Sequence, residues 1–491
     1  MKFGKKILLL VTSLALMIGL FTISAAAGYT DCADSLNQMG LLKGGDNGYD
    51  LDRAPSRSEA AVMMVRFLGQ ENTALTGYAD GTYTDPFTDQ VPSWADPYVA
   101  YLYTIGLTKG TGATTFSPSA SCTAQQYAIF LLRALGYTEA AGDFTYDKAL
   151  AFAAEKGILD PTTAGTSTFL RGNMAAASYT ALGATVKNTT TTLLDKLVTD
   201  NVISADTAKP YQTLFANYAK LQKASAASQQ SAMDADYSLV MSAKSGDTQI
   251  MDMTGKGRFK CDFSSLTNAS LTDTASLISA LAASQMIMTG NYSVAAGDTD
   301  SNLALNLYLK DGVAYIAMDA GTTESNLKVK VDLASLIKDN AGSLDLSNLD
   351  NLASLSTNSV SPTYGLALIK SIDVVNNSNG SVTYTVTMDG LNDYIRSIYA
   401  SMPDMLAALD ESGISYSDAV CHYTFDKNGN LSATDMSIGY SMDGAAMGLS
   451  DDINYTMNMT LTLDTSGKSS SFTYPNDLST YVDIQDLTGT L

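Results

Sequence analysis

Two arginines near the N-terminus, Arg57 and Arg171, occupy the same position in related segments and could bind an anion. Each follows a Gly/Asp-rich loop and begins a short apolar stretch of helical spacing that ends near a glycine. Ala124 fills this position in a third, intervening segment. A guanidinium group is a planar fork of donors that matches a carboxylate, and the free amides of a helix N-terminus also favour negative charge. The pattern therefore indicates at most two working anion pockets.

Arginine in a first helical turn is unfavourable by itself, because the N-terminus is the positive end of the helix dipole. We therefore expect each arginine to have a partner, either an anionic ligand or a carboxylate of the protein surface. Ser56 precedes Arg57 and is expected to cap the helix, and Glu59 completes the same tetrapeptide. Trp94 either stacks on a sugar ring or fills the core between packed helices. Arg57, Arg171, Ser56, Glu59 and Trp94 are the candidate ligand-binding residues.

The elements that position these residues form an internal repeat. Each segment predicts a first helix, a glycine stop, a loop and a second helix. Neither helix of such a pair can bury its apolar stripe alone, so we expect the pairs to pack on one another as one domain over residues 28–186. The segments cover about residues 29–69, 86–136 and 144–184.

These segments resemble the S-layer homology family. The residues that carry the resemblance are Phe87-Thr88-Asp89, Trp94-Ala95, Gly106-Leu107 and Phe116-Ser117-Pro118 in the second segment, and Ser56-Arg57-Ser58-Glu59 in the first. The resemblance implies a non-covalent anchor that binds secondary cell-wall polysaccharide, an acidic and often pyruvylated glycan, in bacteria with thick walls. It also implies that the arginines of the tetrapeptide meet this glycan.

The chain departs from the family pattern in its second and third segments. The second segment has Ala124 in the arginine position and Gln126 in the acidic position, which implies that this pocket has lost charge recognition. The third segment keeps Arg171 but surrounds it with Leu170 and Asn173. Binding weaker than that of a domain with three complete segments is therefore expected.

The N-terminus has the pattern of a secretory signal peptide over residues 1–27. Lys2, Lys5 and Lys6 precede an apolar run from residue 7 to 23, and small residues that a signal peptidase accepts follow directly. A single membrane anchor is the alternative, since the run is near the minimum length of a span. We expect a secreted protein held at the cell wall or cell surface.

The overall charge excludes one class of partner and the cysteines exclude one kind of scaffold. With 50 acidic and 29 basic residues the formal net charge is −21. Nucleic acid is a poor partner for such a surface, because phosphate binding needs clustered Lys and Arg. The four cysteines show no CxxC spacing, so we favour buried thiols over a zinc site, with a Cys32–Cys122 bridge left open. The sequence predicts no metal site and no cofactor.

The second half of the chain changes from helical to alternating spacing. A helical connector is predicted over residues 187–236, followed by an α+β domain over residues 237–491 with a curved antiparallel sheet. Its strand pattern and hairpin turns, such as Asp311-Gly312, are faintly similar to lipoprotein-carrier-type half-barrel proteins. That similarity implies a hydrophobic or lipid-like ligand for this domain. The regularly alternating stretches are 327–333, 382–388, 436–442 and 453–463.

Catalytic residues are not evident in the sequence. The single histidine, His422, follows Cys421 on a predicted strand, so the two side chains point to opposite faces and cannot act together. The fold class that follows is multidomain, an α-helical repeat domain and then an α+β domain. The favoured function is a non-enzymatic, wall-anchored protein with a binding module. A cell-envelope enzyme with its site in the C-terminal domain and a structural S-layer component are the alternatives.

Overall fold

The described residues fall into two compact units. The helical unit comprises residues 29–216 together with 366–368, and the sheet unit comprises the remaining described residues from 217 to 483. The predicted signal peptide lies outside the described residues. This computed structural model describes residues 29–45, 48–159, 169–228, 232–267, 274–297, 299–321, 326–340, 366–389, 391–392, 413–444, 450–465 and 471–483.

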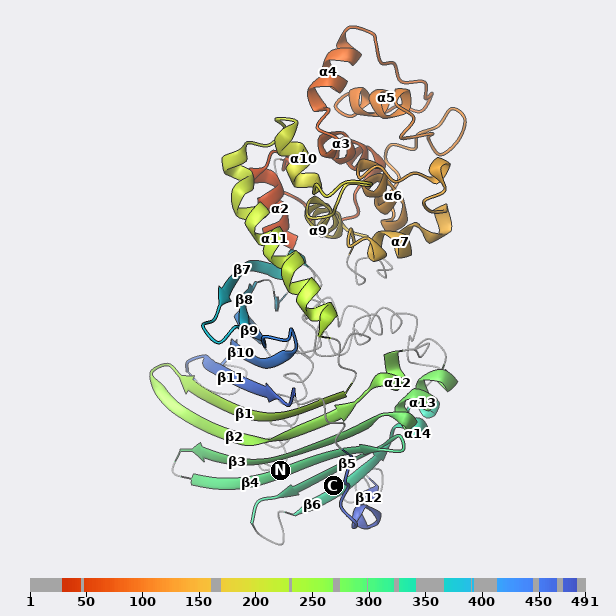
Figure 1. Cartoon of the computed structure of the whole chain (residues 1–491). Coiled ribbons are helices and arrows are strands. Elements are labelled where there is room, and N and C mark those ends of the chain that lie inside the picture. Colours follow the sequence, from red (N-terminus) through yellow and green to blue (C-terminus); the bar gives the residue numbers. More distant parts are fainter. Residues whose placement is uncertain are drawn as a thin grey trace. The chain divides into compact units, whose positions relative to one another are not determined.

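The helical unit is built from short helices whose starts are capped by side chains. Ser56 caps α3 and Thr123 caps α6, each accepting a hydrogen bond from the backbone N–H three residues further on. The last helix, α11, crosses the boundary to the sheet unit. The helices are α2 (Tyr29–Gln38), α3 (Arg57–Phe67), α4 (Glu71–Ala79), α5 (Asp96–Thr104), α6 (Ala124–Ala134), α7 (Ala149–Glu155), α9 (Arg171–Leu182), α10 (Leu193–Thr199) and α11 (Ala205–Ala227) (Figure 1).

Three helix pairs in this unit, α2/α3, α5/α6 and α7/α9, share one local design. The first helix of each pair stops at a glycine with positive φ: Gly40 at +76°, Gly106 at +76° and Gly157 at +67°. The backbone N–H after each glycine returns to a carbonyl of the last helical turn, which satisfies an otherwise unpaired acceptor. The predicted order of helix, glycine stop, loop and helix is therefore confirmed in the first two segments. In the third, the first helix, the glycine stop and the second helix are confirmed, and residues 160–168 between them lie outside the described residues.

Helix α9 lies at the centre of the helical unit. All of its residues are buried, and it packs against α2, α6 and α10. Small side chains allow this close packing. Gly172 is one example, because a Cβ there would come within 2.5 Å of the ring of Tyr29. Arg171 begins this central helix, so its side chain starts from the interior of the unit.

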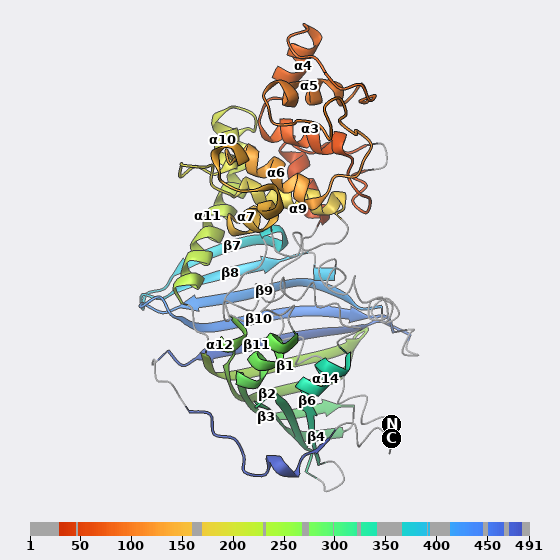
Figure 2. The ribbon, with the colours of Figure 1, turned by 90° about the vertical axis from the view of Figure 1, so that its right-hand side faces the viewer.

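The sheet unit contains one open, curved, twelve-stranded sheet, which confirms the predicted fold class (Figures 1 and 2). The order is β12-β6-β5-β4-β3-β2-β1-β11-β10-β9-β8-β7, and all neighbours are antiparallel except β12 and β6. Helix α14 packs on β5 and β6. The first-half strands are β1 (Ala232–Ser245), β2 (Thr248–Asp262), β3 (Gln285–Ala296), β4 (Thr299–Lys310), β5 (Val313–Asp319) and β6 (Leu327–Asp332). The others are β7 (Ile369–Asn376), β8 (Val382–Met388), β9 (Ser415–Phe425), β10 (Leu431–Met442), β11 (Ile453–Leu463) and β12 (Val482–Asp483), with helices α12 (Ser264–Thr267), α13 (Thr274–Ala283) and α14 (Leu333–Asn340).

One face of the sheet is buried and the other is polar, as the alternation predicts. In β11, for example, Met457, Met459 and Leu461 are buried while the residues between them are exposed or half-buried. Methionine and tyrosine fill much of this buried face and adapt to irregular gaps. The predicted turn Asp311-Gly312 joins β4 and β5 with positive φ at both residues, which suits the twist of a hairpin.

Two buried tyrosines lie flat on the sheet because glycines leave room for them. A Cβ at Gly290 would collide with the hydroxyl of Tyr237, and one at Gly255 would collide with the ring of Tyr292. The two hydroxyls are 2.6 Å apart and satisfy each other. Each glycine therefore supplies space that no other residue can supply.

The cysteines are buried and form no disulfides. The prediction of buried thiols is therefore confirmed, and a Cys32–Cys122 bridge is not present. Cys421 lies on the buried face of β9, and its neighbour His422 is half-buried on the other face. The prediction that these two side chains diverge is therefore confirmed.

Candidate anion-binding site

Arg57 is held by a loop that belongs to the next helix pair. Its Nε donates a hydrogen bond of 2.8 Å to the carbonyl oxygen of Phe116. The backbone N–H of Arg57 donates to the carbonyl oxygen of Ala120 at 2.9 Å. The backbone N–H of Ser58 donates to the carbonyl oxygen of Pro118 at 3.2 Å. The loop between α5 and α6 therefore closes over the start of α3.

Arg171 is held in the same way by a loop of the first helix pair. Its Nε donates a hydrogen bond of 2.7 Å to the carbonyl oxygen of Tyr49. The backbone N–H of Arg171 donates to the carbonyl oxygen of Arg53 at 2.8 Å. The backbone N–H of Gly172 donates to the carbonyl oxygen of Leu51 at 2.9 Å. The three contacts match those of Arg57 one for one, so the two arginines occupy equivalent junctions between helix pairs.

These contacts correct one sequence expectation, that free amides at the helix start would help to bind the ligand. At the start of α3 the first two N–H groups bind loop carbonyls, and the N–H of Glu59 binds the Ser56 hydroxyl at 3.2 Å. The first two N–H groups of α9 are occupied likewise. Buried backbone N–H groups are nearly always hydrogen-bonded, and here another segment of the chain provides the acceptors. The guanidinium groups are the remaining donors.

The Arg57 guanidinium is buried against an aromatic ring. The residue is 6% exposed, and its guanidinium carbon lies 4.9 Å from the centre of the Phe116 ring, a cation–π distance. Asp89 accepts hydrogen bonds from the N–H groups of Phe116 and Ser117 and so fixes this loop. Burial lowers the pKa of Arg57, and the negative charge of Asp89 opposes that change.

Arg57 has no ion pair in the described part of the chain. No carboxylate oxygen of a described residue lies within 4.0 Å of its nitrogens, and its two terminal nitrogens have no hydrogen-bond partner there. A buried charge without a counter-charge is costly. Asp89 acts on Arg57 only at longer range, so the two terminal nitrogens of Arg57 are donors that an added anion could meet.

Arg171, which is 8% exposed, has such a counter-charge. Its NH1 atom lies 2.7 Å from Oε1 of Glu59. Arg53 also binds Glu59, with NH2 at 2.7 Å from Oε1 and NH1 at 3.0 Å from Oε2. Burial alone would raise the pKa of Glu59, but the Arg53 hydrogen bonds, the Ser56 N–H and the charge of Arg171 bring it below its usual value. Glu59 is thus ionised and shared by two arginines.

Ser56 and Glu59 also form a capping box at the start of α3. The Ser56 hydroxyl accepts from the Glu59 N–H, and Oε2 of Glu59 accepts from the Ser56 N–H at 2.7 Å. Both predicted site residues therefore have structural partners. A ligand role for either of them stays a prediction.

Ala124 begins α6 at the position equivalent to Arg57 and Arg171. It is buried, and Thr123 and Gln126 form the capping box around it. The position of the third segment that corresponds in sequence to Phe116 and Tyr49 falls within residues 160–168, outside the described residues. With a methyl group in place of a guanidinium, this position offers no charge to an anion.

Trp94 lies on the surface just before α5. It is 53% exposed, so the alternative in which it fills the core between helices is wrong. No hydrogen bond or ring contact joins it to Arg57 or Arg171 among the residues that the structure describes. An exposed indole can stack on a sugar ring, and that role stays a prediction.

Tyr49 and Arg53 belong to the site although neither was predicted from the sequence, and Phe116 was predicted only as part of the family resemblance. One signal could have found the aromatic pair: Tyr49 and Phe116 each lie seven positions before the N-cap of the second helix. Each is followed by a non-glycine residue with positive φ, Asp50 at 51° and Ser117 at 58°. The chain reverses there and directs the preceding carbonyl at the arginine.

Comparison with known proteins identifies part of the helical unit. Residues 86–128 match the S-layer homology domain. The chain therefore contains an S-layer homology domain. This match contains Trp94, Phe116 and Ala124, whereas Arg57 and Arg171 lie in the pairs on either side.

Three curated relatives are similar to the chain over short stretches. A "Cell surface protein" of Thermoanaerobacter kivui is 28% identical over 173 residues, 32% of this chain and 22% of the relative. A "Middle cell wall protein" of Brevibacillus brevis is 27% identical over 140 residues, 28% of this chain and 13% of the relative. An "Endoglucanase" of Bacillus sp. strain KSM-635 is 36% identical over 88 residues, 16% of this chain and 9% of the relative. The chain thus matches less than a quarter of each relative.

The domain and these relatives support a surface-anchored protein at the cell surface. The endoglucanase similarity is a weak one through the S-layer homology region. The solved structure of the ywiB protein from Bacillus subtilis aligns with 49% of this chain and 97% of its own chain at 8% sequence identity. Its TM-score of 0.15 is too low to indicate a shared fold. Among the described residues, no helix is long and apolar enough to cross a membrane.

Proposed function

We propose that the helical unit anchors the protein to an anionic cell-wall polysaccharide and that Arg57 is its principal anion contact. The observation that carries this proposal is the buried Arg57 guanidinium, which is fixed by Phe116 and lacks a carboxylate partner within the described chain. The S-layer homology domain and the surface-protein relatives support the kind of ligand. A carboxylate or ketal acid of the glycan would supply the missing charge.

The two arginine junctions differ in charge, and this difference favours Arg57 over Arg171. At the Arg171 junction the acid of the first capping box, Glu59, pairs with the guanidinium. The equivalent capping residue for the Arg57 junction is Gln126 of the second helix pair, which is neutral. The Arg57 guanidinium therefore lacks a direct carboxylate partner, with Asp89 acting on it at longer range, while a glycan acid at Arg171 would have to compete with Glu59.

We further propose that the pairs α2/α3 and α7/α9 are additional copies of the S-layer homology repeat. Their glycine stops and their loop-to-helix hydrogen bonds repeat those of the matched segment. Trp94 would add a stacking contact to the same glycan. Arg171 would then serve mainly to join the first and third copies.

The proposal is tested by titrating the full-length chain with purified cell-wall polysaccharide before and after chemical reduction of its carboxylates. We expect saturable binding that reduction weakens at least about tenfold, because a hydrogen bond to a charged group contributes about 1.5–3 kcal/mol. Arg57→Lys should bind more weakly than the parent, since lysine cannot form the planar fork. Equal affinity for the reduced polysaccharide would overturn the assignment of an anionic ligand.

A hydrophobic or lipid-like ligand of the sheet unit remains a prediction without a specific observation in its favour. The methionine- and tyrosine-rich face consists largely of buried side chains. The depression found on the sheet is lined by polar residues of the other face together with Leu239, Val240 and Leu303.

A further inference from the structure

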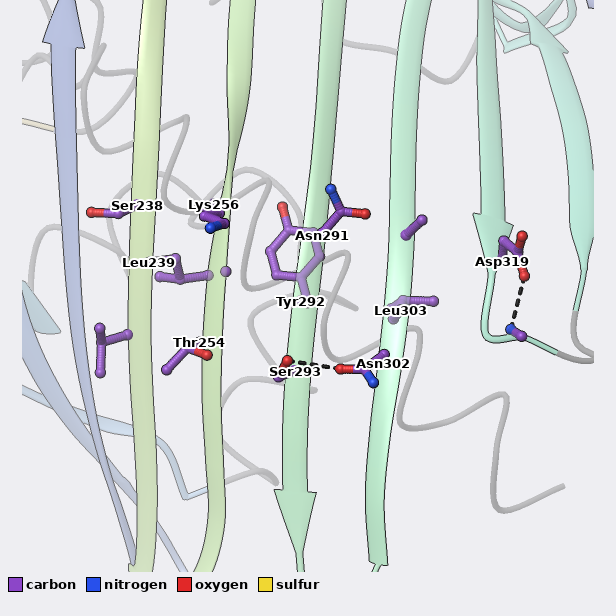
Figure 3. A pocket seen from close by; sticks show the side chains of 14 residues that line it. Ser238, Leu239, Thr254, Lys256, Asn291, Tyr292, Ser293, Asn302, Leu303 and Asp319 are labelled. Atoms are coloured by element: carbon purple, nitrogen blue, oxygen red, sulfur yellow. Dashed lines mark hydrogen bonds between the residues drawn. The ribbon is translucent and has the colours of Figure 1, made fainter.

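A depression of about 790 Å³ lies on the polar face of strands β1 to β5 (Figure 3). Strand pairing explains how its lining comes together. Ser238, Lys256 and Asn291 are direct neighbours across β1, β2 and β3, and their side chains stand side by side in Figure 3. Thr254 and Ser293 form the next row on the same face. Paired residues of an antiparallel sheet point to the same side, so both rows face the depression.

Lys256 supplies the positive charge of this lining and is exposed. No carboxylate of the described residues lies within 4.0 Å of its ammonium group. The next basic residue of the same strand, Arg258, is different because it pairs with Asp234 at 2.7 Å. In a chain with a formal net charge of −21, most anions are repelled by the overall field, so an anion that binds this face needs a local cation such as Lys256.

Three other lysines on this face contact residues 471–483, which cross the sheet and end at β12. Lys260 lies 4.6 Å from the ring centre of Phe472, and Lys310 lies 5.5 Å from that of Tyr474. Lys328 pairs with Asp477 at 2.6 Å. This crossing segment engages those three lysines, whereas Lys256 remains open in the depression beside it.

Neutral hydrogen-bonding groups lie next to Lys256, whereas Asp319, the acidic residue of the lining, stands on β5, three strands away. The Ser293 hydroxyl donates to Oδ1 of Asn302 at 2.8 Å, and within the described part of the chain the Asn302 amide nitrogen has no acceptor. Asn291 adds a second amide. Val240, which is 49% exposed, contributes a small apolar surface within the same lining. Amides, hydroxyls and a small apolar patch suit a polyhydroxylated ring.

We propose that this depression binds an acidic saccharide, with its anionic group on Lys256 and its hydroxyl groups on Asn291, Ser293 and Asn302. It is a second glycan site, separate from the Arg57 pocket. The recognised chemistry is one negative charge flanked by hydroxyl groups. A uronic acid of a polysaccharide and a polyol phosphate of a wall polymer both have this chemistry.

The test uses the full-length chain with Arg57→Ala, which removes the proposed anion contact of the helical unit. Isothermal titration would be carried out with a galacturonic acid tetrasaccharide, a glycerol phosphate oligomer and a neutral galactose oligosaccharide. The first two arms distinguish the carboxylate source from the phosphate source. The test variants are Lys256→Met and Asn302→Ala, and the matched control is Lys244→Met, which removes an exposed lysine of β1 outside the depression.

We expect single-site binding of at least one acidic oligomer and none of the neutral one. Lys256→Met should weaken this binding at least about tenfold, Asn302→Ala should weaken it less, and Lys244→Met should leave it unchanged. High salt should reduce the affinity, because the contact is electrostatic. The proposal is overturned if neither acidic oligomer binds, if the neutral one binds equally, or if Lys256→Met binds like the parent. None of these results affects the proposal for Arg57, which the background variant lacks.

Discussion

Replacing Glu59 by glutamine should reveal how strongly the first and third helix pairs are coupled. The carboxylate of Glu59 lies 2.7 Å from Arg171 and 2.7 Å from Arg53. The side chains of Arg171 and Glu59 are only 9% and 18% exposed, whereas that of Arg53 is 49% exposed. Most of the loss should therefore come from the pair with Arg171.

The magnitude follows from the burial of that pair. Breaking a buried ion pair costs about 3–5 kcal/mol, and an exposed pair contributes up to about 1 kcal/mol. The amide of the variant can still accept one hydrogen bond, and the pocket is not fully closed to water. We therefore expect Glu59→Gln to lower the free energy of unfolding of the helical unit by about 2–4 kcal/mol at pH 7.

The pH dependence of the stability difference between the parent and Glu59→Gln is an independent test of the ion pair. The pKa of Glu59 is lowered in the folded protein, so its stabilisation is complete above the unfolded value of about 4.3 and is lost as the pH falls through the folded value. The difference between the parent and Glu59→Gln should therefore shrink below about pH 4.

Urea unfolding followed by far-ultraviolet circular dichroism at several pH values measures this difference. The matched control is Glu155→Gln, which neutralises an exposed glutamate, 66% exposed, that pairs with Lys156. It should change the free energy of unfolding by less than about 0.5 kcal/mol. A loss below about 0.5 kcal/mol in Glu59→Gln, or a loss that persists unchanged at pH 3, would refute the reasoning.

Three further predictions follow from the structure. Gln126→Glu should place a carboxylate at the position equivalent to Glu59, and we expect it to weaken wall binding about tenfold in a co-sedimentation assay by neutralising Arg57; unchanged binding would contradict the equivalence of the two junctions. Burial and the nearby charge of Asp96 raise the pKa of Asp85 to about 6, so ionisation of Asp85 reduces stability as the pH rises from about 4 to 6. After allowance for solvent screening, Asp85→Asn should be about 1 kcal/mol more stable than the parent at pH 7 and equal to it below pH 4, and equal unfolding curves at pH 7 would count against this. Gly257→Ala should lower the free energy of unfolding of the sheet unit by at least about 2 kcal/mol, since its Cβ would overlap the Thr289 carbonyl and the Tyr237 hydroxyl. The control is Gly45→Ala, which has open space around it. It should be near neutral in the same denaturation measurement.

Much of the fold was predictable because its signals are local. The alternation over residues 453–463 matches β11, and Asp311-Gly312 forms the predicted turn. Glycine stops such as Gly106 ended helices where the spacing required them. Such features depend on neighbouring residues, whose periodicity and allowed backbone angles are visible in the sequence.

The partners of the site residues were not predictable, because they lie far away along the chain. Arg57 binds Phe116 and Arg171 binds both Tyr49 and Glu59, and no periodicity links positions so far apart. The expectation of free amides at the helix start failed for the same reason, since the loop that occupies them belongs to another helix pair. Lys256 has no sequence signal of its own, because only strand register brings its neighbours together.

The central claim is that the Arg57 guanidinium supplies the contact that holds the protein to its wall glycan. Co-sedimentation of full-length Arg57→Ala with purified cell walls tests it most directly, with Arg258→Ala, an exposed arginine of the sheet unit, as the matched control. We expect Arg57→Ala to lose at least about tenfold in wall affinity while its circular dichroism spectrum stays that of the parent and Arg258→Ala pellets normally. Undiminished pelleting of a folded Arg57→Ala protein would contradict the account.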